Sequence, residues 1–200
     1  SFSLEENNFF YYEDEYGGLK LPIPNLLGQF QLSNVANAIA TLRNIEELNI
    51  SDNHIKEGIL KIPSIARLQE IKSGKLKNII KKNKIFVDGS HNALGAKVLT
   101  NYLDTIHSNK HVIIGMMANK DHEKYISFFK NKIQSITTVD IPNQPNAING
   151  EKLKNKISGF DNVNYKKTIL EALKSLKLQE KDIVLITGSL YLAGEVLNLN

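Results

Sequence analysis

Two polar side chains that could act on one small ligand follow the apolar run 85–87. Asp88 ends this run, His91 comes three residues later, and a helical pattern of apolar residues then begins. A carboxylate can hold sugar hydroxyls or orient an imidazole, and an imidazole can contact phosphate or relay a proton. In open α/β sheets, ligands bind beside such loops, outside the carboxyl ends of strands. Alternatively, Asp88 caps the helix and His91 is a polar group of the loop.

Three further residues have chemistry suited to anions. Arg67 is one of only two arginines in the chain, and its forked guanidinium suits phosphate better than the lysine ammonium does. Lys120 follows the apolar run 112–115 and could bind a carboxylate. Ser189 follows the run 183–187 and Gly188, where a ligand can approach the backbone and the next helix offers free N–H groups. The alternatives are a surface salt bridge, a solvated lysine and a simple strand–helix turn.

The elements that must position these residues alternate along the second part of the chain. Alternation of strands with helices predicts an α/β fold with a mostly parallel sheet and helices on both faces. The polar loops 88–92, 118–121, 140–143 and 188–189 would then gather along one edge of the sheet. The strand-like runs are 84–87, 112–115, 136–140 and 183–187, and the helix-like runs are 93–106, 122–132, 150–157, 168–176 and 191–197.

The first part of the chain has a different pattern. Residues 1–24 are typical of a β-hairpin or two edge strands, because short aromatic and alternating runs are broken by glycine and proline. Ser33 is expected to cap one helix, and a second is expected to begin near Ser51 and to end at Pro63. The segment 63–66 is the best boundary, which divides the chain into residues 1–64 and 65–200.

Composition excludes several classes of protein. The chain has 42% hydrophobic residues, no Cys and no apolar run of membrane-spanning length, so we expect no membrane association, and a reducing, cytoplasmic location is permitted. The net charge of +4 comes from dispersed lysines, so nucleic-acid binding is not expected. There is no metal-ligand spacing, no G-x-S-x-G elbow and no G-x-x-x-x-G-K-[ST] phosphate loop.

Five segments, in order, resemble signatures of the folylpolyglutamate synthase/dihydrofolate synthase family within the Mur ligase superfamily. Each signature alone is weak, but their order and their span from residue 27 to residue 191 make the resemblance specific. The segments are 27–35 (G-x-H-Q-x-x-N-A in the family), 66–69 (G-R-L/F-Q), 88–92 (D-x-A-H-N), 115–121 (G-x-x-x-D-K-D) and 187–191 (T-G-S-L-Y).

The resemblance implies an ATP-dependent ligase that activates a folate or dihydropteroate carboxylate as an acyl phosphate, which the amino group of L-glutamate attacks. It also implies a Rossmann-like glutamate-ligase domain at 65–200, preceded by the end of a P-loop ATPase domain at 1–64. By the same resemblance Asn34 contacts the adenine end of ATP, Arg67 and Asp88 contact its phosphates and ribose, and His91 stands at the reaction centre. Lys120 and Ser189 would face the incoming amino acid. The expected enzyme is a monomer.

The chain departs from these signatures at several positions. Phe30 replaces the usual His and Asn119 replaces Asp, whereas Val35 for Ala and Ala66 for Gly are expected to be only steric changes. The family's phosphate loop and Mg²⁺ ligands are expected upstream of Ser1, so the chain alone should not turn over. Two rival readings are a ligase that adds an amino acid to a UDP-muramoyl precursor and a Rossmann-like binding module without catalysis.

Overall fold

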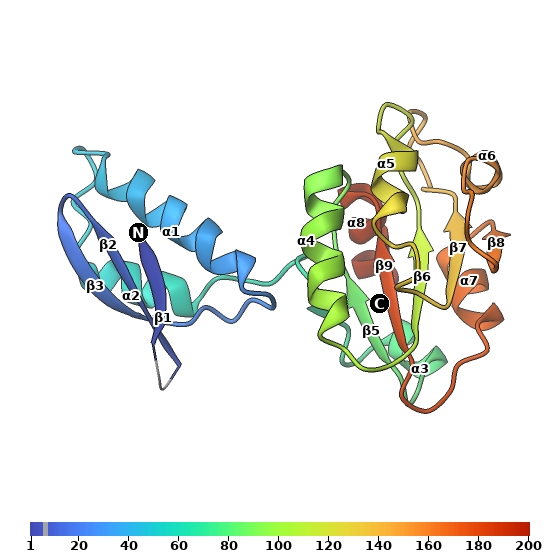
Figure 1. The fold of residues 1–200 in the computed structure, drawn as a ribbon, viewed down its shortest axis with the longest axis horizontal. Coiled ribbons are helices and arrows are strands. Elements are labelled where there is room, and N and C mark those ends of the chain that lie inside the picture. The colour runs from blue at the N-terminus through green and yellow to red at the C-terminus, as the bar shows by residue number, and fades with distance from the viewer. Residues whose placement is uncertain (6–7) are drawn as a thin grey trace. The chain divides into compact units, whose positions relative to one another are not determined.

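The computed structural model describes residues 1–5 and 8–200 and contains two compact units. Unit 1 is Ser1–Ile65 and unit 2 is Ala66–Asn200, drawn in blue to cyan and in green to red in Figure 1. Each unit has its own hydrophobic core. Among the described residues, every helix is too short or too polar to cross a membrane.

Unit 1 is built on a three-stranded antiparallel sheet with the order β1–β2–β3. The predicted hairpin is confirmed in β2 and β3, and β1 adds a third strand that the sequence did not indicate. Gly17 begins β3 with a φ of +102°, a conformation that glycine adopts without strain. The strands are β1 Phe2–Glu5, β2 Phe9–Asp14 and β3 Gly17–Pro22.

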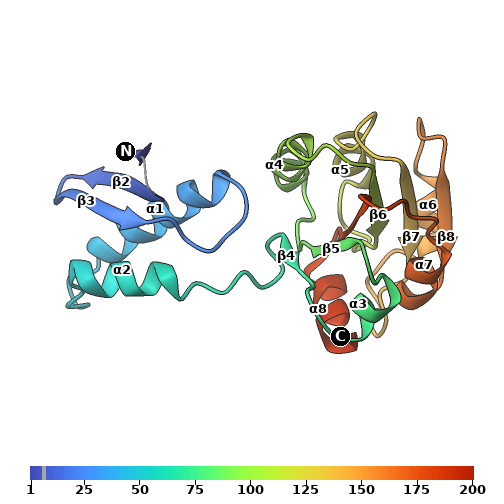
Figure 2. The same ribbon diagram turned by 90° about the horizontal axis from the view of Figure 1, so that it is seen from below.

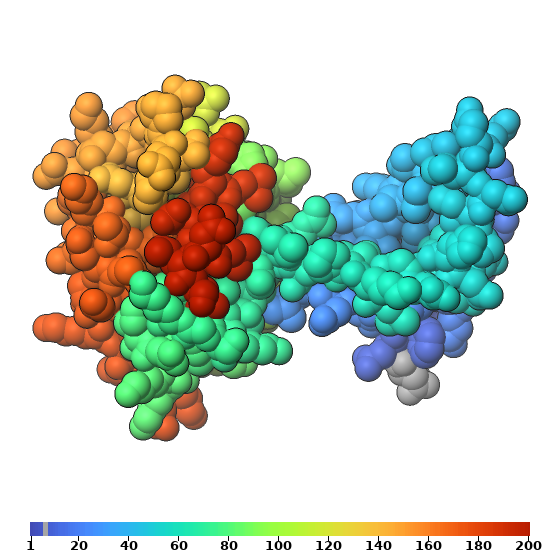
Figure 3. Space-filling view, turned by 180° about the vertical axis from the view of Figure 1, so that it is seen from behind, coloured from blue at the N-terminus to red at the C-terminus, as the bar shows by residue number. Residues whose placement is uncertain are grey.

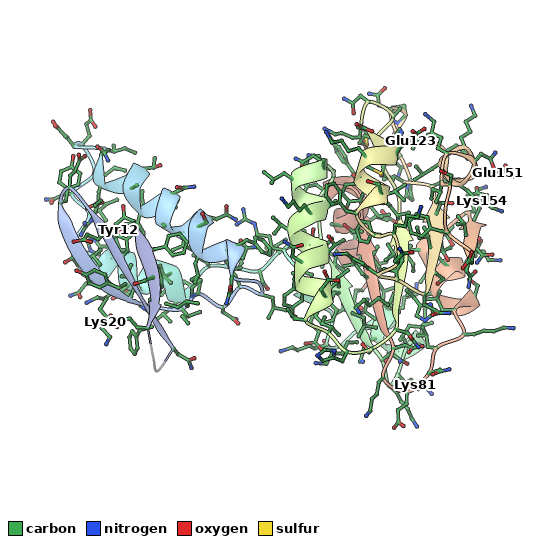
Figure 4. The ribbon with its side chains drawn as sticks, in the orientation of Figure 1. Tyr12, Lys20, Lys81, Glu123, Glu151 and Lys154 are labelled. Carbon is green, nitrogen blue, oxygen red and sulfur yellow. The ribbon has the colours of Figure 1, made fainter. Side chains whose placement is uncertain are left out.

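Two helices, α1 (Phe30–Arg43) and α2 (Asp52–Leu60), complete unit 1. The predicted start of α2 is confirmed, since the Ser51 hydroxyl accepts a hydrogen bond from the His54 N–H, but the helix ends at Leu60, earlier than the predicted end at Pro63. The prediction that Ser33 caps α1 is wrong, because the helix begins three residues earlier and Ser33 lies inside it. Beside the buried Tyr12 ring, labelled in Figure 4, the Arg43 guanidinium joins α1 to Asp14 of β2 at 2.7 Å.

Unit 2 has the expected α/β architecture, a mostly parallel six-stranded sheet with the order β4–β5–β9–β6–β7–β8. Only β4 runs antiparallel, at one edge. The last parallel strand in the sequence, β9, is inserted between β5 and β6, so the loops after these three strands are neighbours. The strands are β4 Gln69–Glu70, β5 Lys84–Val87, β6 Lys110–Ile114, β7 Ser135–Val139, β8 Val163–Lys166 and β9 Ile183–Thr187.

Helices cover both faces of this sheet. Figure 2 shows α4 and α5 on one face and α3, α7 and α8 on the other. Alternate side chains of β5 lie on opposite faces of the sheet. Ile85 and Val87 belong to the core under α3, α7 and α8, whereas Phe86 does not. The helices are α3 Lys75–Ile79, α4 Ala93–Asp104, α5 His122–Ser127, α6 Gly150–Asn155, α7 Ile169–Ser175 and α8 Leu190–Leu199.

The end of the chain packs against the segment before β5, and Figure 3 shows α8 (red) beside this segment (green). The Asn200 side chain accepts a hydrogen bond from the Leu76 N–H at 3.1 Å and donates to the Ser73 carbonyl at 2.9 Å. The side chain of residue 200 therefore supplies the N-terminal cap of the short helix α3.

Candidate functional site

Asp88 organises the loop after β5 through two backbone contacts. One carboxylate oxygen accepts the Leu68 N–H at 2.9 Å, and the other accepts the Ser90 N–H at 2.9 Å. The side chain is only 8% exposed. The alternative that Asp88 caps the following helix is wrong, because Asn92 accepts the Gly95 N–H at the start of α4. Asp88 instead ties the segment around Arg67 to the end of β5.

Arg67 lies at the top of a strained backbone arch, residues Ala66–Leu68. Ala66 has a φ of +52° and Leu68 a φ of +49°, the left-handed region that side chains disfavour. The arch is fixed by the Gly89 N–H, which donates to the Ala66 carbonyl at 2.8 Å, and by Asp88. Arg67 is exposed on this arch, and its guanidinium makes no ion pair with any residue the structure describes.

The backbone conformation sets the steric cost of having Ala66 in place of the motif glycine. At a φ of +52° the cost of alanine is conformational, because its Cβ approaches the neighbouring backbone in the left-handed region. We expect Ala66→Gly to stabilise unit 2 by up to about 1 kcal/mol, with part of the gain offset by the greater entropy of glycine in the unfolded chain. Urea unfolding checks this, with the exposed Gly58→Ala in α2 as a helical reference. A loss of stability in Ala66→Gly would contradict the strain argument.

A cleft of about 530 Å³ opens at the carboxyl ends of the central strands. Figure 4 shows this end of unit 2 at the side labelled Glu123 and Glu151, opposite Lys81. The structure brings three of the predicted site residues, His91, Lys120 and Ser189, into this cleft, whereas Arg67 and Asp88 do not line it. The full lining is His91, Met117, Ala118, Asn119, Lys120, Pro145, Asn146, Ser189, Leu190 and Tyr191.

The His91 ring has a defined tautomer. Its Nδ1 lies 3.0 Å from the Gly89 carbonyl oxygen, which can only accept a hydrogen bond, so Nδ1 carries a proton. In the neutral ring Nε2 is therefore unprotonated, and it contacts no hydrogen-bond partner among the described residues. Nε2 can thus accept a proton from a ligand in the cleft or, once protonated, donate to an anion.

The N-terminus of α8 lines the cleft at the position where Ser189 was predicted to face a ligand. Ser189 is only 2% exposed and its hydroxyl accepts the Tyr191 N–H at 3.1 Å, so it contributes as the helix cap. The preceding Gly188 has a φ of +106°, and a Cβ there would lie 2.7 Å from the Gly115 carbonyl oxygen. Glycine is required here for the backbones of β9 and β6 to approach, which places the positive end of the α8 dipole at the cleft.

The loop after β7 contributes two lining residues, Pro145 and Asn146, that sequence reasoning missed. The Ala118 N–H donates to the Asn146 carbonyl at 2.8 Å, and this contact joins the loop to the segment before Lys120. The predicted edge residue Asp140 serves elsewhere, since it accepts hydrogen bonds from the Gly150 N–H at 2.6 Å and the Tyr165 hydroxyl at 3.0 Å. The only signal in the sequence was the unusual length of this Asn- and Pro-rich loop.

The comparison with family models matches residues 69–190, more than half of the chain, to the Mur ligase glutamate ligase domain. The chain belongs to the Mur ligase family. The matched segment begins at β4 and ends at Leu190, so it contains the cleft loops of this Mur ligase domain and leaves out Arg67. The comparison with curated proteins finds no match.

Solved structures extend the likeness of fold to both units of this Mur ligase chain. Escherichia coli FolC in complex with ADP has a TM-score of 0.76 at 24% identity, and folylpolyglutamate synthase from Thermotoga maritima has 0.73 at 22%. The bifunctional folylpolyglutamate synthase/dihydrofolate synthase of Yersinia pestis, with Mn, AMPPNP and L-glutamate bound, has 0.77 at 20%. Each match covers 98% of this chain and 45% of the other chain.

The charge that lines the cleft of the Mur ligase domain is positive. Among the residues that the structure describes, the half-buried Lys120 is the only fully charged side chain that lines it, and no carboxylate does. Within residues 1–5 and 8–200, no three His, Asp or Glu side chains gather as a metal-binding group. The cleft is therefore suited to an anionic organic ligand, and these residues do not form a ligand set for a divalent cation.

Asn34, the residue that the resemblance assigned to the adenine end of ATP, belongs to unit 1. It lies exposed in the first turns of α1, and its amide donates to the Gln31 side chain at 3.0 Å. Phe30, which replaces the histidine of the family signature, is the first residue of the same helix. The assignment of Asn34 to adenine stays a prediction.

Proposed function

We propose that this chain is the carboxy-terminal part of an ATP-dependent ligase that adds L-glutamate to a folate or dihydropteroate carboxylate through an acyl phosphate. The observation that carries the proposal is the cleft in which Lys120, the α8 N-terminus and His91 meet and which no carboxylate of the described residues lines. In this proposal, residues 65–200 are the glutamate-ligase domain and residues 1–64 are the end of the ATP-binding domain.

L-glutamate has two carboxylates and one amino group, and the cleft offers a complementary group for each carboxylate. The Lys120 ammonium suits one carboxylate, and the N–H groups at the start of α8 suit the other. Once the ammonium has lost one proton to solvent, the amine would attack the acyl carbon, so that the C–N bond forms, the C–O bond to phosphate breaks and inorganic phosphate leaves. The unprotonated Nε2 of His91 would accept the second proton that the nitrogen gives up. The proton on Nδ1, held by the Gly89 carbonyl, keeps the ring in this orientation.

The nucleotide would be contacted from the Ala66–Leu68 arch. Arg67 is exposed, has no ion-pair partner among the described residues and can offer its fork to phosphate oxygens. Each Asp88 oxygen retains a lone pair beyond its backbone contact, so a ribose hydroxyl could still be held there. ATP and Mg²⁺ would be shared with the rest of the ligase, because the described residues form no cluster of metal ligands. Bound Mg²⁺ would neutralise the phosphates.

Several of the solved relatives are complexes with ligands of this kind. One has Mn, AMPPNP and L-glutamate bound, and two others are complexes with ADP, one of which also holds DHPP. Because their identity to this chain is 20–24%, they support the fold, and the substrates rest on the cleft chemistry.

The deciding experiment follows ATP-dependent incorporation of labelled L-glutamate by the complete ligase that contains this chain. Dihydropteroate and a UDP-muramoyl compound are supplied in competition. We expect dihydropteroate or folate to be extended and the UDP-muramoyl compound to be ignored. Incorporation into the UDP-muramoyl compound alone would replace the substrate assignment, and no ATP-dependent incorporation into either would favour a non-catalytic module.

A binding experiment on the 200-residue chain tests the cleft separately. Titration with L-glutamate is expected to shift the NMR signals of Lys120 and Tyr191, whereas L-glutamine, which lacks the second carboxylate, should bind more weakly. Lys120→Gln should remove the difference between the two amino acids. The exposed Lys72→Gln, which does not line the cleft, serves as the matched control.

A further inference from the structure

Three hydroxyl groups meet beneath the cleft, two of them on buried residues and one on the half-buried Ser90. The Tyr125 hydroxyl lies 2.8 Å from the Thr187 hydroxyl and 2.9 Å from the Ser90 hydroxyl, and the last two lie 3.3 Å apart. Tyr125 is fully buried and Thr187 is 1% exposed. Each hydroxyl has one proton to donate and can accept, so the three satisfy one another in a closed triangle.

The three hydroxyls come from or adjoin three of the segments that build the cleft. Ser90 directly precedes His91 in the loop after β5, and Thr187 ends β9 and leads into Gly188 and Ser189. Tyr125 lies in α5, which begins two residues after Lys120. The triangle therefore links the segments that carry His91, Lys120 and the α8 N-terminus, although none of its members lines the cleft.

Ser90 is held at every polar group. Its N–H donates to Asp88 at 2.9 Å, its carbonyl accepts the Gly188 N–H at 3.1 Å, and its hydroxyl belongs to the triangle. It stands where the family signature D-x-A-H-N has alanine, which has no hydroxyl, so in this chain the triangle includes a member that the signature does not supply. The residue next to the anchored Ser90 is His91, which lines the cleft.

We propose that Ser90, Tyr125 and Thr187 form a positioning network that fixes the His91 ring relative to Lys120 and the α8 N-terminus. Its catalytic consequence rests on the function proposed above. The network works without charge, since burial raises the pKa of Tyr125 far above its ordinary value and the phenol stays protonated. Its effect should therefore be independent of pH over the neutral range.

The first test uses the 200-residue chain and does not depend on catalysis. In Ser90→Ala we expect the ring ¹⁵N signals of His91 to move toward a mixture of tautomers. The Gly188 amide should exchange with solvent about 5-fold faster, as the loss of one buried neutral hydrogen bond implies. Thr138→Val is the matched control, because Thr138 is buried and donates to the Asn164 carbonyl at 3.2 Å away from the cleft.

An unchanged His91 tautomer in Ser90→Ala would overturn the proposal. Equal acceleration of Gly188 amide exchange in Thr138→Val would also overturn it, because it would indicate a general loss of stability. Tyr125→Phe provides a second variant, since it keeps the buried ring and removes only the hydroxyl.

The second test measures glutamate ligation by the complete ligase. Ser90→Ala and Tyr125→Phe are expected to lower kcat about 10-fold and to leave KM for ATP unchanged, with no shift in the pH profile. The double variant should lose less than the product of the single effects, because both changes open the same triangle. If the wild-type ligase incorporates no glutamate, the proposed function fails while the NMR test still decides the network. Normal kcat in both variants would reject the positioning role.

Discussion

Replacing Arg67 or His91 by Ala in the complete ligase should lower kcat for glutamate ligation by about 10²- to 10³-fold, while the protein stays folded. A preorganised group that meets developing charge in the transition state is worth roughly 3–4 kcal/mol, which corresponds to this range. Stability should change little, because Arg67 is exposed and, within the described part of the chain, it makes no ion pair and the His91 side chain makes a single hydrogen bond, to the Gly89 carbonyl. Steady-state kinetics and a thermal melt of each variant measure the two effects.

Two further variants make this prediction specific. Arg67→Lys keeps the charge and loses the planar fork, so its kcat should lie between those of the wild type and Arg67→Ala. His107→Ala removes an exposed imidazole that does not line the cleft, and its kcat should be unchanged. Wild-type rates in both Arg67→Ala and His91→Ala would remove these residues from the chemistry, even if glutamate ligation itself is observed.

The central strands of unit 2 could be predicted from sequence because they are buried on both faces. The predicted bounds of β5 and β9 agree with the structure, since continuous apolar runs such as Ile183–Thr187 are typical of interior parallel strands. The edge strand β8 was missed, because none of its residues is fully buried and no apolar run marks it. Helix α3 was missed since its cap comes from Asn200, far along the sequence.

The candidate site was predictable where a residue follows a buried strand. His91, Lys120 and Ser189 were found in this way, and β9 lies between β5 and β6, so their loops meet. The positive φ of Ala66 and the approach of the loop carrying Asn146 depend on tertiary contacts that no local pattern encodes. The same holds for the hydroxyl triangle, whose members are far apart in sequence.

A second polar network lies at the opposite end of the parallel strands from the cleft, where these strands begin. Asp182, 4% exposed, accepts the Gln179 N–H at 2.8 Å, the Asn109 amide at 3.0 Å and the His111 Nε2–H at 3.2 Å. The other ring nitrogen of His111 lies 2.8 Å from the Ser135 hydroxyl. This network joins the starts of β6, β7 and β9, and none of its members reaches the cleft.

Asp182→Asn should destabilise unit 2 by about 3 kcal/mol at neutral pH, because it removes the charge from a buried, fully paired carboxylate. Burial alone would raise the pKa of Asp182, but the hydrogen bonds from Gln179, His111 and Asn109 outweigh it, and the pKa falls below its ordinary value of 3.8. A carboxyl whose pKa is lowered by folding contributes stability that is fully present above the unfolded pKa and is lost as the pH falls through the folded pKa.

The wild-type free energy of unfolding should therefore decline as the pH falls below about 5, and this decline should be shallower in Asp182→Asn. Urea unfolding at several pH values, followed by NMR signals of β7 and β9, isolates unit 2, since two compact units need not unfold together. Asp104→Asn supplies the control, because its exposed pair with Lys132 should contribute less than about 1 kcal/mol. Equal stability and equal acid sensitivity in Asp182→Asn and the wild type would contradict this prediction. The carboxylate would then contribute nothing beyond an amide, and packing alone would hold the starts of β6 and β9 together.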